Sequence, residues 1–471
     1  MAHETVHARI GLVGLGVMGA NLALNIAENG FPIAVYNRTG SVTDDFMASA
    51  GDLAPALLPA KTPQDLVASL QSPRAIIIMV QAGGPVDAVI ETLRPHLEEG
   101  DMIIDAGNAN FHDTRRREAA LRETGIRFFG MGVSGGEEGA RHGPSIMVGG
   151  DPAAFEAIRD IIEAISAKFK GTPCATHFGP DGAGHFVKTV HNGIEYADMQ
   201  MIAEVYGLLR DGQDRDAPGI GALFESWDKG PLSSYLVEIT GKVLQATDPE
   251  TGRPMVEMIV DSAGQKGTGR WTAIEAITLG QSPSTIEAAV AARAWSAAKP
   301  ARIDGAALFA STDAPAFTLS DDTLEQALLA AKIIAYDQGF SLLAAASEAF
   351  DWDMDLADCA EVWRAGCIIR STMLDEMAAA IREGLPHGQL IFAPRFAARL
   401  ETATTALRRV VAEAALTGLP VPAFSAALAY FDTMRQARGT ADVIQAQRDF
   451  FGAHGFARTD GGVGHHGPWG A

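Results

Sequence analysis

A glycine-rich turn near the start of the chain constrains the fold more than any other feature. The stretch ARIGLVGLGVMGANLALNIAENG, residues 8–30, has the pattern of an apolar strand, a turn and an amphipathic helix. The turn is spaced Gly14-x-Gly16-x-x-Gly19. The first glycine permits a tight bend, the second lets a ligand approach the backbone, and the third lets the helix pack on the strand. The pattern therefore predicts a dinucleotide-binding domain, with a pyrophosphate at the helix N-terminus.

Alternating strands and helices continue to residue 181. Apolar segments at residues 74–80 and 101–107 look like buried parallel strands, and helical stretches separate them. Further strands are expected in IRFFGMGVSGG, PSIMVGG and ATHFG, around a helix at residues 152–167. We therefore predict a Rossmann-like, doubly wound sheet over residues 1–181.

The pattern changes to long helices after this point. Helical periodicity dominates residues 182–437, which we expect to form a large all-helical domain. Residues 438–471 end in the glycine-rich RTDGGVGHHGPWGA, which cannot pack a core by itself. We expect this tail to be disordered or to lie on another subunit, and its two adjacent histidines to be inert. The predicted fold class is α/β plus all-α.

The end of the second strand predicts which coenzyme is bound. Proteins that prefer NAD usually carry Asp or Glu there, hydrogen-bonded to the ribose 2′-hydroxyl. This chain has Asn37-Arg38-Thr39, and a guanidinium can pair with a 2′-phosphate. NADP is therefore favoured. NAD stays possible, because the following GSVTDDF adds two acids and no second basic residue. The loops QAGG, GNAN and VSGG follow strands and are expected around the nicotinamide.

The bulk composition excludes several classes of protein. The formal net charge of −21, from 37 basic and 58 acidic side chains, argues against non-specific nucleic-acid binding. The chain has no secretory signal pattern and no uninterrupted apolar run of about 18 residues. Cys174, Cys359 and Cys367 cannot form a disulfide framework and lack metal-ligand spacing. We expect a cytoplasmic protein with no membrane span and no metal site.

A polar stripe lies on the first helix of the helical part. In GHFVKTVHNGIEYADMQ, residues 184–200, Lys188, His191, Asn192 and Glu195 fall at i, i+3, i+4 and i+7 on one face. Most stripes of this kind are solvated surface. The spacing alone therefore leaves open both an ordinary wet face and a reaction centre.

Four specific motifs narrow this choice. They are VSGGEEGARHGPS at residues 133–145, KTVHNGIEY at 188–196, DSAGQKGTGRW at 261–271 and QAQRDFFGAH at 445–454. Together with the glycine turn they closely resemble the decarboxylating 6-phosphogluconate dehydrogenases in their long, homodimeric form. The resemblance covers nearly the whole chain. It implies oxidation of 6-phospho-D-gluconate to D-ribulose 5-phosphate and CO2 with reduction of NADP.

The resemblance also implies a role for each matching residue. Lys188 matches the general base and acid, and Glu195 matches the second acid. Arg448 and His454 match tail residues that enter the active site of the neighbouring subunit. The remaining substrate-binding positions would be Asn108, Ser134, Gly135, Gly136, His191, Asn192, Tyr196, Lys266, Thr268 and Arg293, of which Tyr196, Lys266, Thr268 and Arg293 match the phosphate site. The coenzyme-binding positions would be Gly14, Gly16, Val17, Met18, Gly19, Asn37, Arg38, Thr39, Val80, Gln81, Ala82 and Asn108.

Several loops depart from the family pattern. Gln81 replaces the usual lysine of VKAG, and Ala106 and Ala109 change the usual GGNS to AGNA. These changes lie on the coenzyme side and put the selectivity between NADP and NAD in question. Two alternative functions are weighed against the resemblance. One is a β-hydroxyacid dehydrogenase that acts on an unphosphorylated acid, and the other is a non-catalytic NADP-binding protein.

Overall fold

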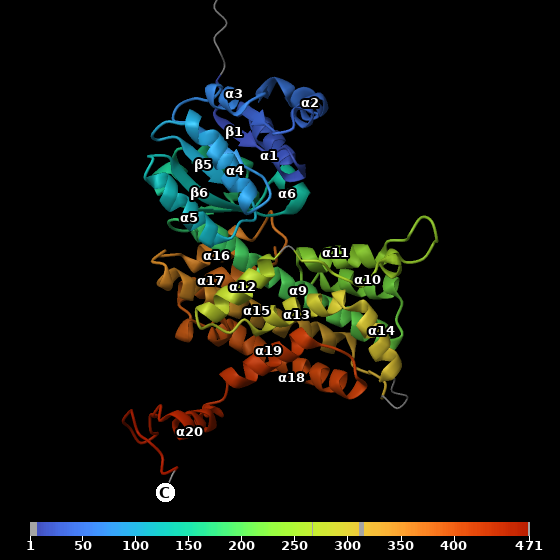
Figure 1. The fold of residues 1–471 in the computed structure, drawn as a ribbon. Coiled ribbons are helices and arrows are strands. Elements are labelled where there is room, and N and C mark those ends of the chain that lie inside the picture. The colour runs from blue at the N-terminus through green and yellow to red at the C-terminus, as the bar shows by residue number, and fades with distance from the viewer. Residues whose placement is uncertain (1–6, 266, 310–314, 470–471) are drawn as a thin grey trace, which may run out of the picture.

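The computed structural model describes residues 7–265, 267–309 and 315–469. Figure 1 shows a sheet-containing part, a larger helical part beneath it, and a C-terminal helix that stands apart from both. The predicted combination of a Rossmann-like domain with an all-helical domain is confirmed.

Eight strands form one sheet in the order β10-β7-β6-β5-β4-β1-β2-β3. All neighbours pair in parallel except β6 and β7, which are antiparallel because only the short helix α6 connects them. The strands are β1 Ile10–Val13, β2 Ile33–Tyr36, β3 Leu57–Pro59, β4 Ala75–Ile78, β5 Met102–Asp105, β6 Arg127–Val133, β7 Ile146–Gly149 and β10 Ala175–His177. A separate hairpin pairs β8 Lys168–Phe169 with β9 Thr172–Pro173.

Apolar side chains cover both faces of this sheet. Along β4, Ile76 and Ile78 join one buried cluster and Ile77 joins the other, as expected for the alternation of side chains along a strand. Helices pack on both faces, which makes the sheet doubly wound. They are α1 Val17–Glu28, α2 Gly40–Ser49, α3 Pro63–Ala68, α4 Gly84–Leu93, α5 Phe111–Arg122, α6 Gly136–His142, α7 Pro152–Glu156 and α8 Arg159–Ile165.

Two details of the sheet part differ from the sequence prediction. The single helix expected at residues 152–167 is broken at Ile158, whose φ of −125° leaves the helical region, so α7 and α8 are separate. The edge strand β3 was not predicted, because it has three residues and ends in a proline.

The helical part is built on two long helices, α9 Ala183–Gln213 and α15 Asp321–Ala349. They pack together, and a buried ion pair of 3.0 Å joins Lys332 of α15 to Asp198 of α9. The other helices of this part are α10 Ala217–Trp227, α11 Tyr235–Gln245, α12 Thr268–Thr278, α13 Ser284–Ala297, α14 Lys299–Leu308, α16 Leu356–Val362, α17 Met373–Glu383, α18 Pro394–Thr417 and α19 Pro422–Met434. The C-terminal helix that stands apart is α20 Ala441–Gly452.

Helix α15 is long and apolar enough to pass a test for a membrane span by length and composition. However, 89% of its most apolar window is buried inside the protein. Helix α15 is therefore the core helix of the helical part, and it packs between α9 and α18.

Candidate active site

Helix α9 lies directly against the antiparallel corner of the sheet. A Cβ atom added to Gly184 of α9 would come within 2.5 Å of the backbone nitrogen of Gly149 in β7. One added to Gly132 of β6 would lie 2.5 Å from Cβ of Lys188. The absence of side chains at these glycines lets the helix and sheet touch, and this contact brings Lys188 next to the loop that follows β6.

Lys188 is almost fully buried, with 6% of its surface exposed. Its Nζ donates a hydrogen bond of 3.0 Å to Oγ of Ser134 and lies 3.2 Å from Nδ1 of His191. Burial lowers the pKa of Lys188, and the nearby Glu195 carboxylate partly opposes this shift. A lysine in this setting can lose its proton more readily than one at the surface and can act as a base. The ordinary wet face is therefore excluded.

His191 and Glu195 complete the polar group. Nε2 of His191 lies 3.2 Å from Oγ of Ser134, and Nδ1 lies 3.7 Å from Oε2 of Glu195. Burial, with the neighbouring Lys188, holds the pKa of His191 well below its usual value, so the ring is neutral. Burial raises the pKa of Glu195, although Lys188 and Arg293 oppose the shift. A carboxyl group with a raised pKa is suited to donate a proton.

Asn192 has an unused acceptor. Its side chain is buried, and Oδ1 has no hydrogen-bond partner among the described residues. Buried amide oxygens are nearly always paired, so this atom is available to accept a hydrogen bond from a hydroxyl of a bound molecule. Ser134 and Gly135 lie in the loop after β6, and Gly136 begins α6 at an exposed position.

Of the predicted phosphate-site residues, Arg293 lies beside Tyr196, and Thr268 begins the helix α12, whose Gly269 packs on the Tyr196 ring. The guanidinium of Arg293 stacks on the Tyr196 ring, with Cζ 3.6 Å from the ring centre, and Nη1 donates to the Gly264 carbonyl at 3.3 Å. Thr268 is buried at the start of α12. Lys266 falls outside the described residues. The structure therefore brings an arginine and the start of α12 together at Tyr196, the residue that follows Glu195.

A cleft of about 920 Å³ follows the carboxyl ends of the strands. It reaches from the glycine turn to Thr268 and Trp271 of the helical part, and Val133, the neighbour of Ser134, also lines it. Ten of the predicted coenzyme positions border this cleft, namely Gly14, Gly16, Val17, Met18, Gly19, Asn37, Val80, Gln81, Ala82 and Asn108.

The glycine turn fits a dinucleotide. Gly14 has φ +103°, and a Cβ atom at Gly19 would overlap the Gly14 carbonyl oxygen, so neither position tolerates a side chain. A Cβ atom at Gly16 would meet nothing, because it would project into open space at the cleft. Gly16 caps α1 without any side-chain hydrogen bond, which leaves N–H groups free for an anion.

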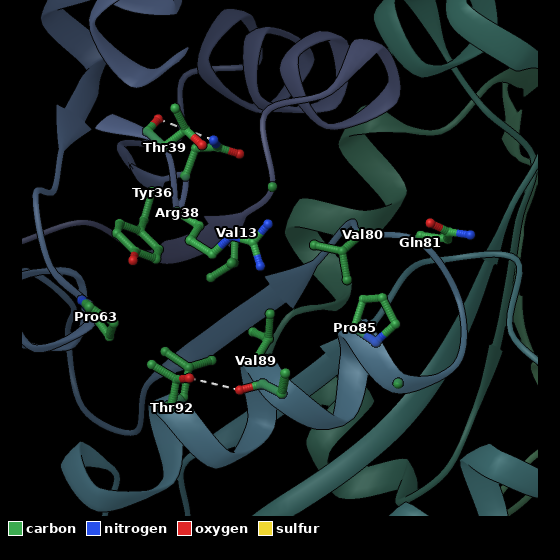
Figure 2. Close-up of a pocket in the computed structure, with 15 residues that line it drawn as sticks. Val13, Tyr36, Arg38, Thr39, Pro63, Val80, Gln81, Pro85, Val89 and Thr92 are labelled. Atoms are coloured by element: carbon green, nitrogen blue, oxygen red, sulfur yellow. Dashed lines mark hydrogen bonds between the residues drawn. The ribbon is translucent and has the colours of Figure 1, made fainter. Parts of the chain in front are cut away.

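A second cavity of about 510 Å³ continues the cleft beyond β2. Figure 2 shows its lining, which includes Arg38 and Thr39 from the loop after β2 and Pro85, Val89 and Thr92 from α4. The predicted positions Asn37, Arg38 and Thr39 all lie here. Asn37 supports the turn itself, because its Oδ1 accepts a hydrogen bond of 3.1 Å from the Leu15 backbone nitrogen.

Two predicted site residues lie elsewhere in the single chain. Arg448 and His454 are exposed at the C-terminal helix α20, which stands apart from α9 (Figure 1). Among the described residues, the side chain of Arg448 forms a hydrogen bond only with Gln445. Of the two terminal histidines, for which the sequence predicts no metal-binding role, His466 makes a contact that was not predicted: its Nδ1 lies 2.6 Å from Oδ1 of Asp449 and helps to hold the tail in shape.

One contact between the two parts was missed in the sequence. His112, at the start of α5, bonds through Nε2 to Oε1 of the buried Glu275 on α12 at 2.9 Å. No local signal marks this pair, because its members are 163 residues apart. No group of three or more His, Cys, Asp or Glu side chains that could hold a metal ion occurs within the described ranges.

The fold and the site together define a pyridine-nucleotide-dependent dehydrogenase, with a buried lysine bonded to Ser134 next to Val133 in the wall of the cleft. Residues 9–179 match the model of the NAD binding domain of 6-phosphogluconate dehydrogenase. Residues 184–469 match the model of the 6-phosphogluconate dehydrogenase C-terminal domain. The chain therefore belongs to the 6-phosphogluconate dehydrogenase family.

Individual relatives agree over the full length. The decarboxylating 6-phosphogluconate dehydrogenase of Synechococcus elongatus is 47% identical, covering 98% of this chain and 99% of the relative. The NAD(+)-dependent, decarboxylating 6-phosphogluconate dehydrogenase of Bacillus subtilis is 45% identical, covering 96% of this chain and 97% of the relative. The 6-phosphogluconate dehydrogenase structure of Plasmodium falciparum, studied with NADP+ and with 6-phosphogluconate, is 39% identical with a TM-score of 0.94, covering 98% and 100%. These matches disfavour both alternative functions.

Proposed function

We propose that this chain oxidises 6-phospho-D-gluconate with NADP and decarboxylates the product, giving D-ribulose 5-phosphate, CO2 and NADPH. The observation that carries the proposal is the burial of Lys188 against Ser134 and His191, beside Glu195. Family membership supports the reaction, and the glycine turn and its cleft support the coenzyme.

Lys188 is the proposed base for the oxidation. Its neutral amine takes the proton of the substrate 3-hydroxyl while a hydride leaves C3. When bound, NADP supplies the acceptor for that hydride. Ser134 and the neutral ring of His191 hold the amine in place through the contacts described above. Because burial lowers the pKa of Lys188, the neutral form is more accessible than in a surface lysine.

The same lysine serves the decarboxylation. The bond between C1 and C2 of the 3-keto acid breaks, and its electron pair forms a C2–C3 double bond as the carbonyl oxygen accepts a proton from the Lys188 ammonium. Glu195 then gives a proton to the carbon that lost CO2, and Lys188 takes back the hydroxyl proton to leave the ketone. The raised pKa of Glu195 favours the protonated form that this step needs.

The phosphate and the carboxylate of the substrate fix its orientation. We propose that Arg293, Thr268 and Lys266, with the Tyr196 hydroxyl, bind the 6-phosphate. At the other end, the Ser134-Gly135-Gly136 loop and Asn192, with His191 and Asn108, hold the carboxylate and hydroxyls. The free Oδ1 of Asn192 supports this arrangement, since a hydroxyl donor would satisfy it.

The coenzyme is proposed to be NADP, with NAD as a possible second acceptor. Arg38 and Thr39 line the outer cavity, where a 2′-phosphate would lie, and the cleft holds the remaining coenzyme positions. The acidic helix α2 follows directly and contributes Asp44 and Asp45 but no basic residue. We expect a preference for NADP that rests mainly on Arg38.

We further propose a homodimer in which the tail, residues 438–471, completes the partner's site with Arg448 and His454. Apolar side chains exposed on the helical part, at residues 182–437, and on the tail support an interface of this kind. Phe450 and Phe451 of α20 are 67% and 73% exposed in the single chain, and Trp295 of α13 is 58% exposed. The three buried free cysteines fit the reducing cytoplasm, which we propose as the location.

The central test is a comparison of substrates and coenzymes. Initial rates are measured with 6-phosphogluconate or gluconate, each with NADP or NAD, and CO2 release is followed in parallel. We expect turnover of 6-phosphogluconate with NADP, loss of CO2 in equal amount, and negligible rates with gluconate. Equal rates on the two acids would remove the phosphate assignment, and NADPH formed without CO2 would remove the decarboxylation.

The tail is tested by mixing two inactive variants. Lys188→Ala and Arg448→Ala chains are dissociated, mixed and reassociated. If the tail acts across subunits, a mixed dimer contains one site with both residues intact, and activity returns. If each tail serves its own chain, no site in the mixed dimer is intact. Sedimentation of the full chain and of a chain ending at Gly439 reports whether the tail also holds the dimer together.

A further inference from the structure

A buried guanidinium on α5 contacts both loops that form the nicotinamide side of the cleft. Arg117 is 2% exposed and belongs to none of the motifs discussed above. Its Nη2 donates a hydrogen bond of 2.9 Å to the carbonyl oxygen of Gly83, in the loop between β4 and α4. Its Nη1 lies 3.4 Å from Oδ2 of Asp105, at the end of β5.

The first loop depends on this contact. Gly83 has φ 90° and ψ −141°, and a Cβ atom at Gly83 or Gly84 would meet nothing within 4 Å. These two glycines therefore add no side-chain packing to the loop. Its fixed points are the Gly83 carbonyl, which also accepts a bond from the Val86 backbone nitrogen, and Asp87 in the first turn of α4.

Asp87 ties the same guanidinium to α4. Nε and Nη2 of Arg117 donate to the two oxygens of Asp87 at 2.8 and 3.1 Å. This bidentate pairing fixes the plane of the guanidinium and so the direction of its bond to Gly83. Arg117, with Arg116, lowers the pKa of Asp87, which keeps the carboxylate charged.

The second loop is reached through Asp105. This carboxylate is fully buried, and its Oδ1 accepts a hydrogen bond of 3.0 Å from the Gly107 backbone nitrogen. Gly107 and Asn108 line the same cleft as Gln81, Ala82 and Gly83, in the loop after the neighbouring strand. One guanidinium thus links the backbone of both loops.

We propose that Arg117 is a positioning residue that sets the spacing of the 81–84 and 106–110 loops and thereby the affinity for the nicotinamide half of the coenzyme. Arg117 does not line the cleft, so it acts only through its contacts with Gly83, Asp87 and Asp105. The proposal rests on the proposed use of NADP. It predicts that loss of the Arg117 side chain weakens binding of the nicotinamide half of the coenzyme and leaves binding of the adenosine half unchanged.

The test compares Arg117→Lys with Arg116→Met by titration calorimetry of the full-length protein. A lysine keeps the positive charge but cannot reach Gly83, Asp87 and Asp105 at once. Arg116 is the matched control, because it also pairs with Asp87, at 3.1 Å, but is exposed and contacts neither loop. The ligands are NADP and 2′,5′-ADP, which carries only the adenosine half and its phosphates.

We expect Arg117→Lys to weaken NADP binding by about tenfold or more while binding of 2′,5′-ADP and the KM for 6-phosphogluconate change less than about twofold. Arg116→Met should match the wild type throughout. If Arg117→Lys does not fold, the charge-balanced Arg117→Met/Asp105→Asn variant replaces it, since Asn keeps the acceptor for Gly107. Unchanged NADP affinity, or equal loss for both ligands, would overturn the proposal. A wild-type protein that does not bind NADP would instead overturn the proposed function.

Discussion

The carboxyl group of Glu204 makes the stability of this protein depend on pH in an unusual direction. Glu204 lies on α9, four turns beyond Lys188, and is 4% exposed. It accepts hydrogen bonds of 2.8 and 3.0 Å from the backbone nitrogens of Ala423 and Phe424, and so caps α19. Burial nevertheless raises its pKa from 4.5 to about 7, because the loss of hydration outweighs these two bonds and a third, of 3.0 Å, from Nε2 of Gln200.

The sign of the effect follows from the two pKa values. In the unfolded chain the carboxyl ionises near pH 4.5, whereas the folded protein keeps the proton until about pH 7. Between these values folding takes up a proton, so the free energy of unfolding falls as the pH rises. Integrated from about pH 5 to about pH 8, this group alone removes about 2.5 kcal/mol of stability. Above the folded pKa its contribution is constant.

The assay is urea unfolding followed by circular dichroism, at steps across that pH range, for the wild type and Glu204→Gln. Glutamine cannot ionise, so the difference in unfolding free energy between the two proteins should change by about 2.5 kcal/mol in favour of the variant as the pH rises. Glu401→Gln, at an exposed position of α18, is the control and should follow the wild type. If wild type and Glu204→Gln lose stability in parallel, the raised pKa is refuted.

Four further predictions concern the site. Lys188→Met should lower kcat by roughly a thousandfold with NADP affinity retained, as measured by calorimetry, and a near-normal rate would exclude the base role. In the wild type, burial lowers the pKa of Lys188 below the ordinary value of 10.5. The value of kcat/KM should therefore stay high below pH 10.5 and fall only at the lower pH where the amine becomes protonated. A fall in kcat/KM that begins at the pKa of free lysine would contradict this. Gly19→Ala should weaken NADP binding by about tenfold or more, because its methyl group would overlap the Gly14 carbonyl, and unchanged affinity would show that the turn adapts. Arg38→Leu should reduce the ratio of kcat/KM with NADP to that with NAD by about tenfold, and a constant ratio would shift selectivity to other residues.

Local patterns predicted much of this fold correctly. The glycine turn and the apolar strands gave the sheet, because period-two alternation and glycine spacing are local properties of the chain. The periodicity of α9 likewise placed Lys188, His191, Asn192 and Glu195 on one face. The break at Ile158 and the antiparallel direction of β7 were not predictable from local periodicity, since both depend on how these segments pack against the rest of the sheet part.

The burial of the site residues and their long-range contacts could not be predicted from periodicity. Lys188 is buried because Gly132, which is distant in the sequence, leaves room for it, and no local pattern reports such a contact. The pair His112 and Glu275 and the three contacts of Arg117 are likewise long-range. The roles of Arg448 and His454 depend on a second chain, and they stay predictions.

The contact between α9 and the sheet has a mechanical consequence. Backbone atoms of the helix at Gly184 and of the sheet at Gly149 meet without an intervening layer of side chains. Side chains can slide or change rotamer, but two backbones in direct contact behave as one stiff joint. Helix α9, which carries Lys188, and the sheet, which carries the glycine turn, therefore move as one rigid unit. Any closure over bound molecules therefore has to come from the segments at the edge of the cleft, which is lined by the 81–84 loop, the 106–110 loop and the start of α12.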